Sequence, residues 1–180
     1  MIKAAKNKMF SSKLRMTISI TVVALLVIAL VIFLLVTTKE ELVAKVDGTP
    51  ITKKEFQARV NEQAHFFNQA RQSYDETVIL EQTKNNLIDE KIIKNYATRK
   101  NISVSEDEIK QRFSAVAQNR SSEKELIDEL KSLYGKDKAS YLTTLQNDLL
   151  REKVSESIDT NFFLWLSQQR NIVDIEYITK

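Results

Sequence analysis

The sequence predicts a mainly α-helical fold, in which an N-terminal transmembrane helix precedes a multi-helix domain closed by a small β-sheet from its sequence ends. Three observations predict this fold. The 180 residues include only two Gly and one Pro, so tight turns are scarce and helices are long. Apolar residues recur at helical spacing through most of the chain. Ser or Thr followed three residues later by Glu marks several helix starts.

Residues 1–15 form a basic leader. Five of the 27 basic residues lie in this leader, which has no acidic residue, so the rest of the chain is slightly acidic although the formal net charge is +3. Nucleic-acid binding needs a basic face on the folded part, and this charge distribution does not predict one. The absence of Cys excludes disulfides, thiolate metal sites and a lipidated Cys.

Residues 16–38, from Met16 to Thr38, contain no charged side chain and are rich in Val, Leu and Ile. As a helix this segment would extend about 34 Å, enough for a hydrocarbon core of about 30 Å. Because the basic residues precede it, the N-terminus is expected in the cytoplasm and residues 39–180 outside, in a single-pass protein of the cell membrane. A cleaved signal peptide is the alternative, but no small-x-small cleavage site follows Val36. A buried helix of a soluble domain is disfavoured by the length and apolarity of the segment.

The strand candidates lie at the two ends of the region after the apolar segment. Leu42–Val46 precedes Asp47-Gly48, a strong tight-turn dipeptide, and Pro50–Ile51 continues the extended chain. The alternating stretch Ile172–Ile178 is the last candidate. Pairing of the first and last strands would close the domain.

Six helices are expected between these strands, each with three or four apolar positions that need partners. Thr52, Ser105, Ser122 and Thr160 are candidate caps, with Glu55, Glu108 and Glu125 completing capping boxes. The helices are expected at about 53–72, 75–100, 106–119, 123–134, 138–158 and 161–170.

The run Leu87–Phe113, LIDEKIIKNYATRKNISVSEDEIKQRF, contains one helix end and the next helix start. Asn101 tolerates the left-handed conformation of a helix terminus, and Ile102 is placed to fold back on the last turn. This punctuation, the opening VAKVDGTPITKKEF and the later LYGKDKASYLTTLQNDLLREKV resemble the N-terminal chaperone domain of the SurA, PrsA and PpiD group of extracytoplasmic folding factors.

The resemblance implies binding of unfolded exported polypeptides. In that group a parvulin prolyl-isomerase domain is commonly inserted before a closing helix and strand. Here NFFLWLSQQRNIVDIEYI, which resembles that closing segment, follows Ile158 after Asp159 and Thr160 alone. With two Gly and one His in the chain, a parvulin site is not expected, so the protein is predicted not to be an enzyme.

Aromatic residues are the candidates for gripping apolar stretches of an unfolded chain. Phe66 and Phe67 are adjacent on one expected helix, about 100° apart, so both cannot easily face one core. Phe162 and Phe163 repeat this arrangement. The alternative is that both members of each pair are buried. The candidate polypeptide-binding residues are Phe66, Phe67, Tyr74, Tyr141, Phe162, Phe163 and Trp165.

No motif predicts catalysis, a cofactor or a metal. His65 is the only histidine and is read as a partly exposed helix residue. The sequence therefore predicts a membrane-anchored extracytoplasmic chaperone without isomerase activity, whose partners are unfolded or nascent polypeptides, membrane lipid around residues 16–38 and a possible secretion-machinery partner. A non-enzymatic scaffold or interaction subunit for one specific membrane or secretion partner is the alternative.

Overall fold

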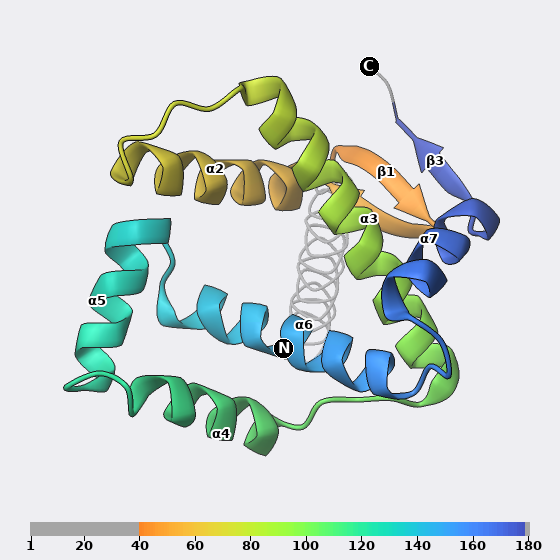
Figure 1. Cartoon of the computed structure of the whole chain (residues 1–180). Coiled ribbons are helices and arrows are strands. Elements are labelled where there is room, and N and C mark those ends of the chain that lie inside the picture. Colours follow the sequence, from red (N-terminus) through yellow and green to blue (C-terminus); the bar gives the residue numbers. More distant parts are fainter. Residues whose placement is uncertain (1–39, 179–180) are drawn as a thin grey trace, which may run out of the picture. The chain divides into compact units, whose positions relative to one another are not determined.

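The computed structural model describes residues 40–178, which form one compact unit from Glu41 onward (Figure 1). The predicted leader, transmembrane helix and domain boundary at residues 1–39 lie outside the described residues. Among residues 40–178, no helix combines the length and apolarity needed to cross a membrane. The elements are β1 (Leu42–Val46), β2 (Thr49–Thr52), α2 (Lys53–Gln69), α3 (Glu76–Lys100), α4 (Glu106–Ala117), α5 (Glu123–Tyr134), α6 (Lys138–Glu156), α7 (Phe162–Ile172) and β3 (Ile175–Tyr177).

A three-stranded antiparallel sheet joins the two ends of this unit, in the order β2-β1-β3. Asp47 and Gly48 have φ angles of 47° and 76°, the left-handed pair that a two-residue hairpin turn requires. Val46 pairs with Ile175 and Ala44 with Tyr177, which confirms the predicted closure by the first and last strands.

The last strand is shorter than predicted. The helix before it was expected to end at residue 170, but α7 continues through Ile172, and Val173 caps it. The Asp174 amide donates to the Asp47 carboxylate at 3.0 Å, so pairing begins only at Ile175. The hairpin turn, which is distant in sequence, therefore sets where β3 begins.

The predicted punctuation between α3 and α4 is confirmed. Asn101 adopts the left-handed conformation with φ 55°, and the Ile102 amide donates to the Ala97 carbonyl at 2.9 Å. Ser105 and Glu108 form a reciprocal capping box. These capping bonds are local, because each spans at most five residues. Lys153 on α6 adds distant contacts to the same corner, with the Ser103 carbonyl at 2.8 Å and the Glu108 carboxylate at 2.6 Å.

Three other caps differ from their predictions. Thr52 and Ser122 cap α2 and α5, but the third-position glutamates do not complete the boxes. The Glu55 carboxylate pairs with Lys91 at 3.0 Å, and that of Glu125 accepts from a neighbouring backbone amide at 2.7 Å. Asn161, not Thr160, caps α7. Its side-chain oxygen accepts hydrogen bonds from the backbone amides of Phe163 and Leu164.

Two apolar clusters hold the unit together. The sheet core contains the buried residues Ala44, Val46, Ile51, Leu87, Ile88, Ile92, Ile93, Ala97, Val154, Trp165 and Leu166. The outer core is smaller and contains Phe113, Leu126, Leu130 and Leu145, with partly buried neighbours from α4, α5 and α6.

Helices α2 and α6 lie on opposite sides of a frame that α3 and α5 complete (Figure 1). Helix α2 contacts α3 and α5, while α6 contacts α3 and α4. The space bounded by these helices is lined by side chains from several elements, and the cavities described below lie there.

Candidate functional site

A cavity of about 270 Å³ lies where α2, α3 and α5 meet. Phe66 and Phe67 on α2, Leu87 on α3 and Tyr134 at the end of α5 give it an apolar lining. Drug-sized ligands usually occupy about 300–1,000 Å³. The size and lining therefore suit one or two apolar side chains of a larger molecule.

Ring contacts fix the shape of this cavity. Phe66 stacks on Tyr134 with centroids 5.3 Å apart and planes 5° apart, while Phe67 lies 5.4 Å from Tyr74. Phe66 and Phe67 also meet edge to face at 5.8 Å. Four rings thus form a continuous aromatic surface across α2, the α2–α3 loop and α5. Tyr74 and Tyr134 are 38% and 37% exposed, so part of this surface is accessible to solvent.

Thr83 lies in the lining on the α3 side and is 1% exposed. Its hydroxyl oxygen has no hydrogen-bond partner among the described residues. An unpartnered buried hydroxyl costs free energy, on the order of 1–3 kcal/mol. A molecule that enters the cavity with a polar group could regain part of that cost.

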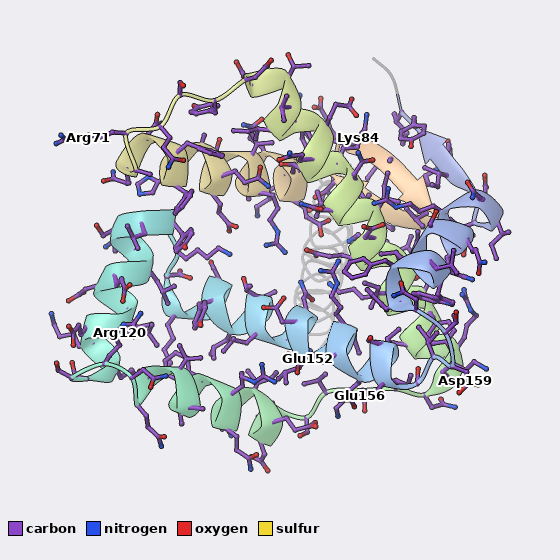
Figure 2. All side chains as sticks on the ribbon, in the orientation of Figure 1. Arg71, Lys84, Arg120, Glu152, Glu156 and Asp159 are labelled. Atoms are coloured by element: carbon purple, nitrogen blue, oxygen red, sulfur yellow. The ribbon has the colours of Figure 1, made fainter. Side chains whose placement is uncertain are left out.

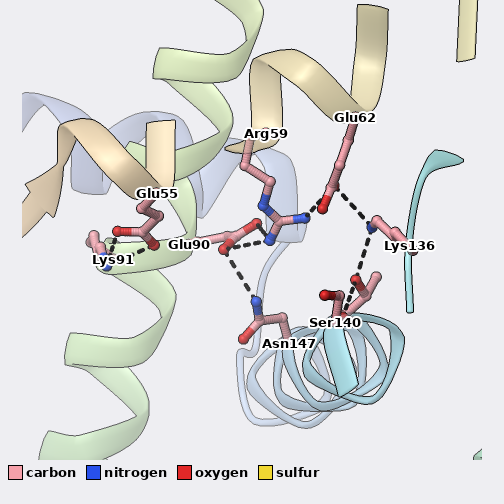
Figure 3. A network of polar contacts seen from close by, with 9 residues as sticks. Glu55, Arg59, Glu62, Glu90, Lys91, Lys136, Ser140 and Asn147 are labelled. Atoms are coloured by element: carbon pink, nitrogen blue, oxygen red, sulfur yellow. Dashed lines mark hydrogen bonds and ion pairs between the residues drawn. The ribbon is translucent and has the colours of Figure 1, made fainter. Parts of the chain in front are cut away.

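A chain of ion pairs borders the cavity (Figure 3). Arg59 on α2 donates to Glu90 on α3 at 2.9 Å and 3.2 Å and lies 3.7 Å from Glu62. Lys136, after α5, pairs with Glu62 at 3.1 Å, and Asn147 on α6 donates to Glu90 at 3.2 Å. The charges at the cavity mouth are therefore neutralised by one another, and the same contacts hold four segments at a fixed spacing.

A second cavity, of about 240 Å³, lies between α2, α3 and α6. It shares Arg59, Glu62 and Glu90 with the aromatic cavity, so the ion pairs stand between the two. Lys94 on α3 also lines it, and burial lowers the pKa of this ammonium, an effect that Glu90 partly opposes. Backbone carbonyls of an extended peptide would be suitable acceptors for such a partly desolvated donor.

The structure places the predicted aromatic candidates in three different settings. Phe66 and Phe67 are half-buried and line the aromatic cavity, and Tyr74 packs against Phe67 beside it. Tyr141 packs against the outer core, 6.2 Å from Phe113, and burial raises the pKa of its phenol.

The three candidates on α7 are separate from this cavity and differ in exposure. Phe163 is 75% exposed. Phe162 is half-buried and stacks on Trp165 at 5.7 Å, and Trp165 is only 7% exposed. In the folded domain Trp165 packs in the sheet core and offers almost no surface to a partner, because it also lies edge to face against Tyr96 at 4.9 Å.

Sequence reasoning missed Tyr134, Leu87 and Thr83 as cavity residues. Tyr134 precedes the helix-ending Gly135, which places it on the last turn of α5, but the packing of α5 on α2 has no local sequence signal. Leu87 reads as an ordinary core position and Thr83 as a polar position on a helix.

His65 lies on α2 and its Nε2 donates to the Ser132 carbonyl at 2.8 Å, linking α2 to α5. This contact fits the expectation of a partly exposed helix histidine with a structural partner. Within residues 40–178 no group of three His, Cys, Asp or Glu side chains could hold a metal ion.

Comparison with known protein families matches residues 1–155 to the SurA-like N-terminal domain. The matched range includes β1, β2 and the helices through nearly all of α6, and it stops before α7 and β3. No curated protein matches the chain.

Proposed function

We propose that this chain, which belongs to the SurA-like N-terminal domain family, is a membrane-anchored extracytoplasmic chaperone for unfolded exported polypeptides. Domains of this family are associated with protein folding and bind unfolded polypeptide in general. The finer assignment is to a holdase or foldase-like protein without isomerase activity, with residues 16–38 as anchor in the cell membrane and residues 39–180 outside.

The aromatic cavity is the observation that carries this proposal. It offers exposed ring surface and a volume that suits side chains rather than a whole metabolite. Burying one large apolar side chain contributes about 1.5–3 kcal/mol, from which the cost of ordering the client must be subtracted. Each contact is therefore weak and reversible, and few features of the cavity would select one sequence over another.

The ion pairs beside the cavity suit the same task. Because Arg59 and Lys136 are already paired with Glu90 and Glu62, no bare charge must be desolvated when an apolar segment enters. Anchoring to the membrane would raise the effective concentration of such a weak site near emerging chains. A partner in the secretion machinery would also raise the effective concentration of the site near emerging chains.

The absence of isomerase activity is part of the proposal. Residues 157–161 alone connect α6 to α7, where the resembled group commonly inserts a parvulin domain. Measuring cis–trans interconversion of a proline peptide with residues 39–180 tests it, and catalysis above the uncatalysed rate would contradict it.

The chaperone assignment is tested by mixing residues 39–180 with an unrelated, chemically unfolded protein and following aggregation by light scattering. Suppression is expected at near-stoichiometric ratios. Phe66→Ser removes the stacking partner of Tyr134 and should reduce suppression severalfold, while Phe163→Ser, an equally drastic change outside the cavity, should leave it nearly intact.

A second variant guards against misfolding of the first. Asn86 is exposed at the cavity lining, so Asn86→Trp adds an indole there without removing any core side chain. Loss of suppression in a variant with unchanged thermal unfolding would locate the client site. Unchanged suppression in both cavity variants would contradict it.

The scaffold alternative has one observation in its favour. Phe163, Leu164 and Ile172 on α7 are 75%, 54% and 73% exposed. A specific partner would give one saturable complex in which Phe163→Ser weakens binding, whereas the chaperone binds many unfolded chains and depends on Phe66.

A further inference from the structure

The start of the sheet is tied closely to the apolar segment 16–38. Only Lys39, Glu40 and Glu41 separate Thr38 from Leu42, the first residue of β1. Four residues of fully extended chain reach about 14 Å at most. If the apolar segment spans a membrane as proposed above, Leu42 must lie within this distance of the bilayer surface.

Strand pairing determines what else lies beside Leu42. Thr52 at the end of β2 pairs with Leu42, and the Lys53 amide donates to the Glu41 carbonyl at 2.7 Å. On the other edge, the Ile178 amide donates to the Val43 carbonyl at 2.9 Å, just past the end of β3. The start of α2 and the end of β3 therefore lie at the same end of the sheet as the start of β1.

Tyr177, the last residue of β3, is 54% exposed at this end. The ammonium of Lys84 on α3 lies 5.6 Å from the centre of its ring, and Figure 2 shows Lys84 in the half of α3 nearer the helix start. An exposed ring with a polar tip beside a lysine is the pair of side chains that favours a membrane–water interface.

The first turn of α2 holds two lysines, Lys53 and Lys54. Cations are unfavourable at a helix N-terminus because the macrodipole is positive there, so the helix itself gives no reason for the exposed Lys54. Lys53 is paired with Glu41 at 2.7 Å, and Lys84 with Glu81 at 2.7 Å. Attraction to anionic lipid is expected to be modest, with Tyr177 making the main contact.

We infer that this end of the domain, formed by the starts of β1 and α2 and the end of β3, rests on an anionic phospholipid surface. Tyr177 lies at the level of the headgroups, and Lys53, Lys54 and Lys84 lie beside lipid phosphates. This inference rests on the proposed membrane anchor and adds to it an orientation. Phe66 and Phe67 of the aromatic cavity lie near the end of α2, at the opposite end of that helix from Lys53 and Lys54, so their ring surface would remain accessible to polypeptide.

The test uses the full chain inserted into vesicles of phosphatidylcholine and phosphatidylglycerol with brominated acyl chains, which quench nearby tryptophan. Tyr177→Trp is compared with Phe163→Trp, a matched exposed aromatic on α7. In Figure 2, Asp159, four residues before Phe163, lies well apart from Lys84. The native Trp165 is buried and contributes the same background to both variants.

Quenching of Tyr177→Trp is expected to exceed that of Phe163→Trp by at least about twofold and to decrease with Lys53→Gln and Lys54→Gln. Equal quenching in a chain that resists alkaline extraction from the vesicles would overturn this inference and leave the anchor standing. A chain that alkaline treatment releases would overturn the anchor, and the inference with it. Thermal unfolding of each variant in detergent verifies that the fold is retained.

Discussion

The sheet core and the outer core differ in size and in where their residues come from. The sheet core combines β1 near the start of the described chain with Trp165 and Leu166 near its end. The outer core comes from residues 113–145 and has four buried members. A core that joins distant segments can form only when the whole domain folds, whereas a local one can open separately. The aromatic cavity takes Phe66 from α2 and Tyr134 from α5, so its shape depends on the packing of these two helices.

Surface ion pairs do not compensate for the smaller outer core. Arg112 pairs with Glu152, and Arg120 with Glu129 at 2.6 Å, but these side chains are one-third to one-half exposed. Exposed pairs contribute about 0–1 kcal/mol each. The outer part is therefore expected to be the less stable region, and three changes test this comparison in order of decreasing effect.

The largest effect is expected from removing the closing segment. A chain ending at Ile158 lacks α7 and β3, so it loses Trp165 and Leu166 from the sheet core and leaves one edge of β1 unpaired. Urea unfolding followed by far-ultraviolet circular dichroism should lose its cooperative transition. Because the family match ends at residue 155, a truncated chain that still unfolds cooperatively would show that the closing segment is dispensable.

An intermediate effect is expected from single cavities in the two cores. Ile92 and Leu126 are 1% and 2% exposed, so truncation of each to Ala leaves a buried void. Ile92→Ala should lower the free energy of unfolding by about 3–5 kcal/mol, and Leu126→Ala by about 2–3 kcal/mol because the smaller cluster relaxes more readily.

Hydrogen exchange distinguishes these two variants further. Leu126→Ala should accelerate exchange mainly in α4 and α5, while Ile92→Ala should accelerate it throughout residues 40–178. A uniform response to both substitutions would contradict a separately opening outer region.

The smallest effect concerns the start of α4. The Lys153 ammonium, 2.6 Å away, and the hydrogen bonds from Ser105 lower the pKa of Glu108 from 4.5 to about 2. Because this pKa is lower in the folded than in the unfolded chain, the contribution to stability is complete above pH 4.5 and is lost as the pH falls toward 2.

Glu108→Gln should therefore flatten the decrease in stability between pH 4.5 and 2. Glu106→Gln is the matched control, because Glu106 is on the same turn with a 91% exposed side chain. A carboxyl titration by NMR that gives Glu108 an ordinary pKa would contradict the contact with Lys153.

Local interactions explain which parts of the fold the sequence predicts. The Asp47-Gly48 turn, the Asn101 helix end and the Ser105 capping box are each formed within a few residues, and all three are confirmed. The prediction that Glu55 and Glu125 complete capping boxes is wrong, because other donors bind their carboxylates. One of these donors is Lys91 on another helix.

The candidate site was predictable only in part. Adjacent aromatics on a helix predict that one of Phe66 and Phe67 leaves the core, and in the structure both line the cavity. Tyr134 and Thr83 could not be predicted, because their roles depend on how α5 and α3 pack on α2. Trp165 was also a predicted polypeptide-binding residue, but it is buried, because α7 closes the sheet core.

The most direct test of the central claim is an NMR titration of residues 39–180 with an unfolded, soluble polypeptide. The account predicts that backbone amide shifts concentrate at Arg59–Phe67 of α2, Thr83–Glu90 of α3 and Tyr134–Lys136, and that they weaken in Asn86→Trp. Shifts confined to Phe163–Ile172 of α7 would contradict it. So would the absence of shifts at concentrations at which residues 39–180 suppress aggregation of the client.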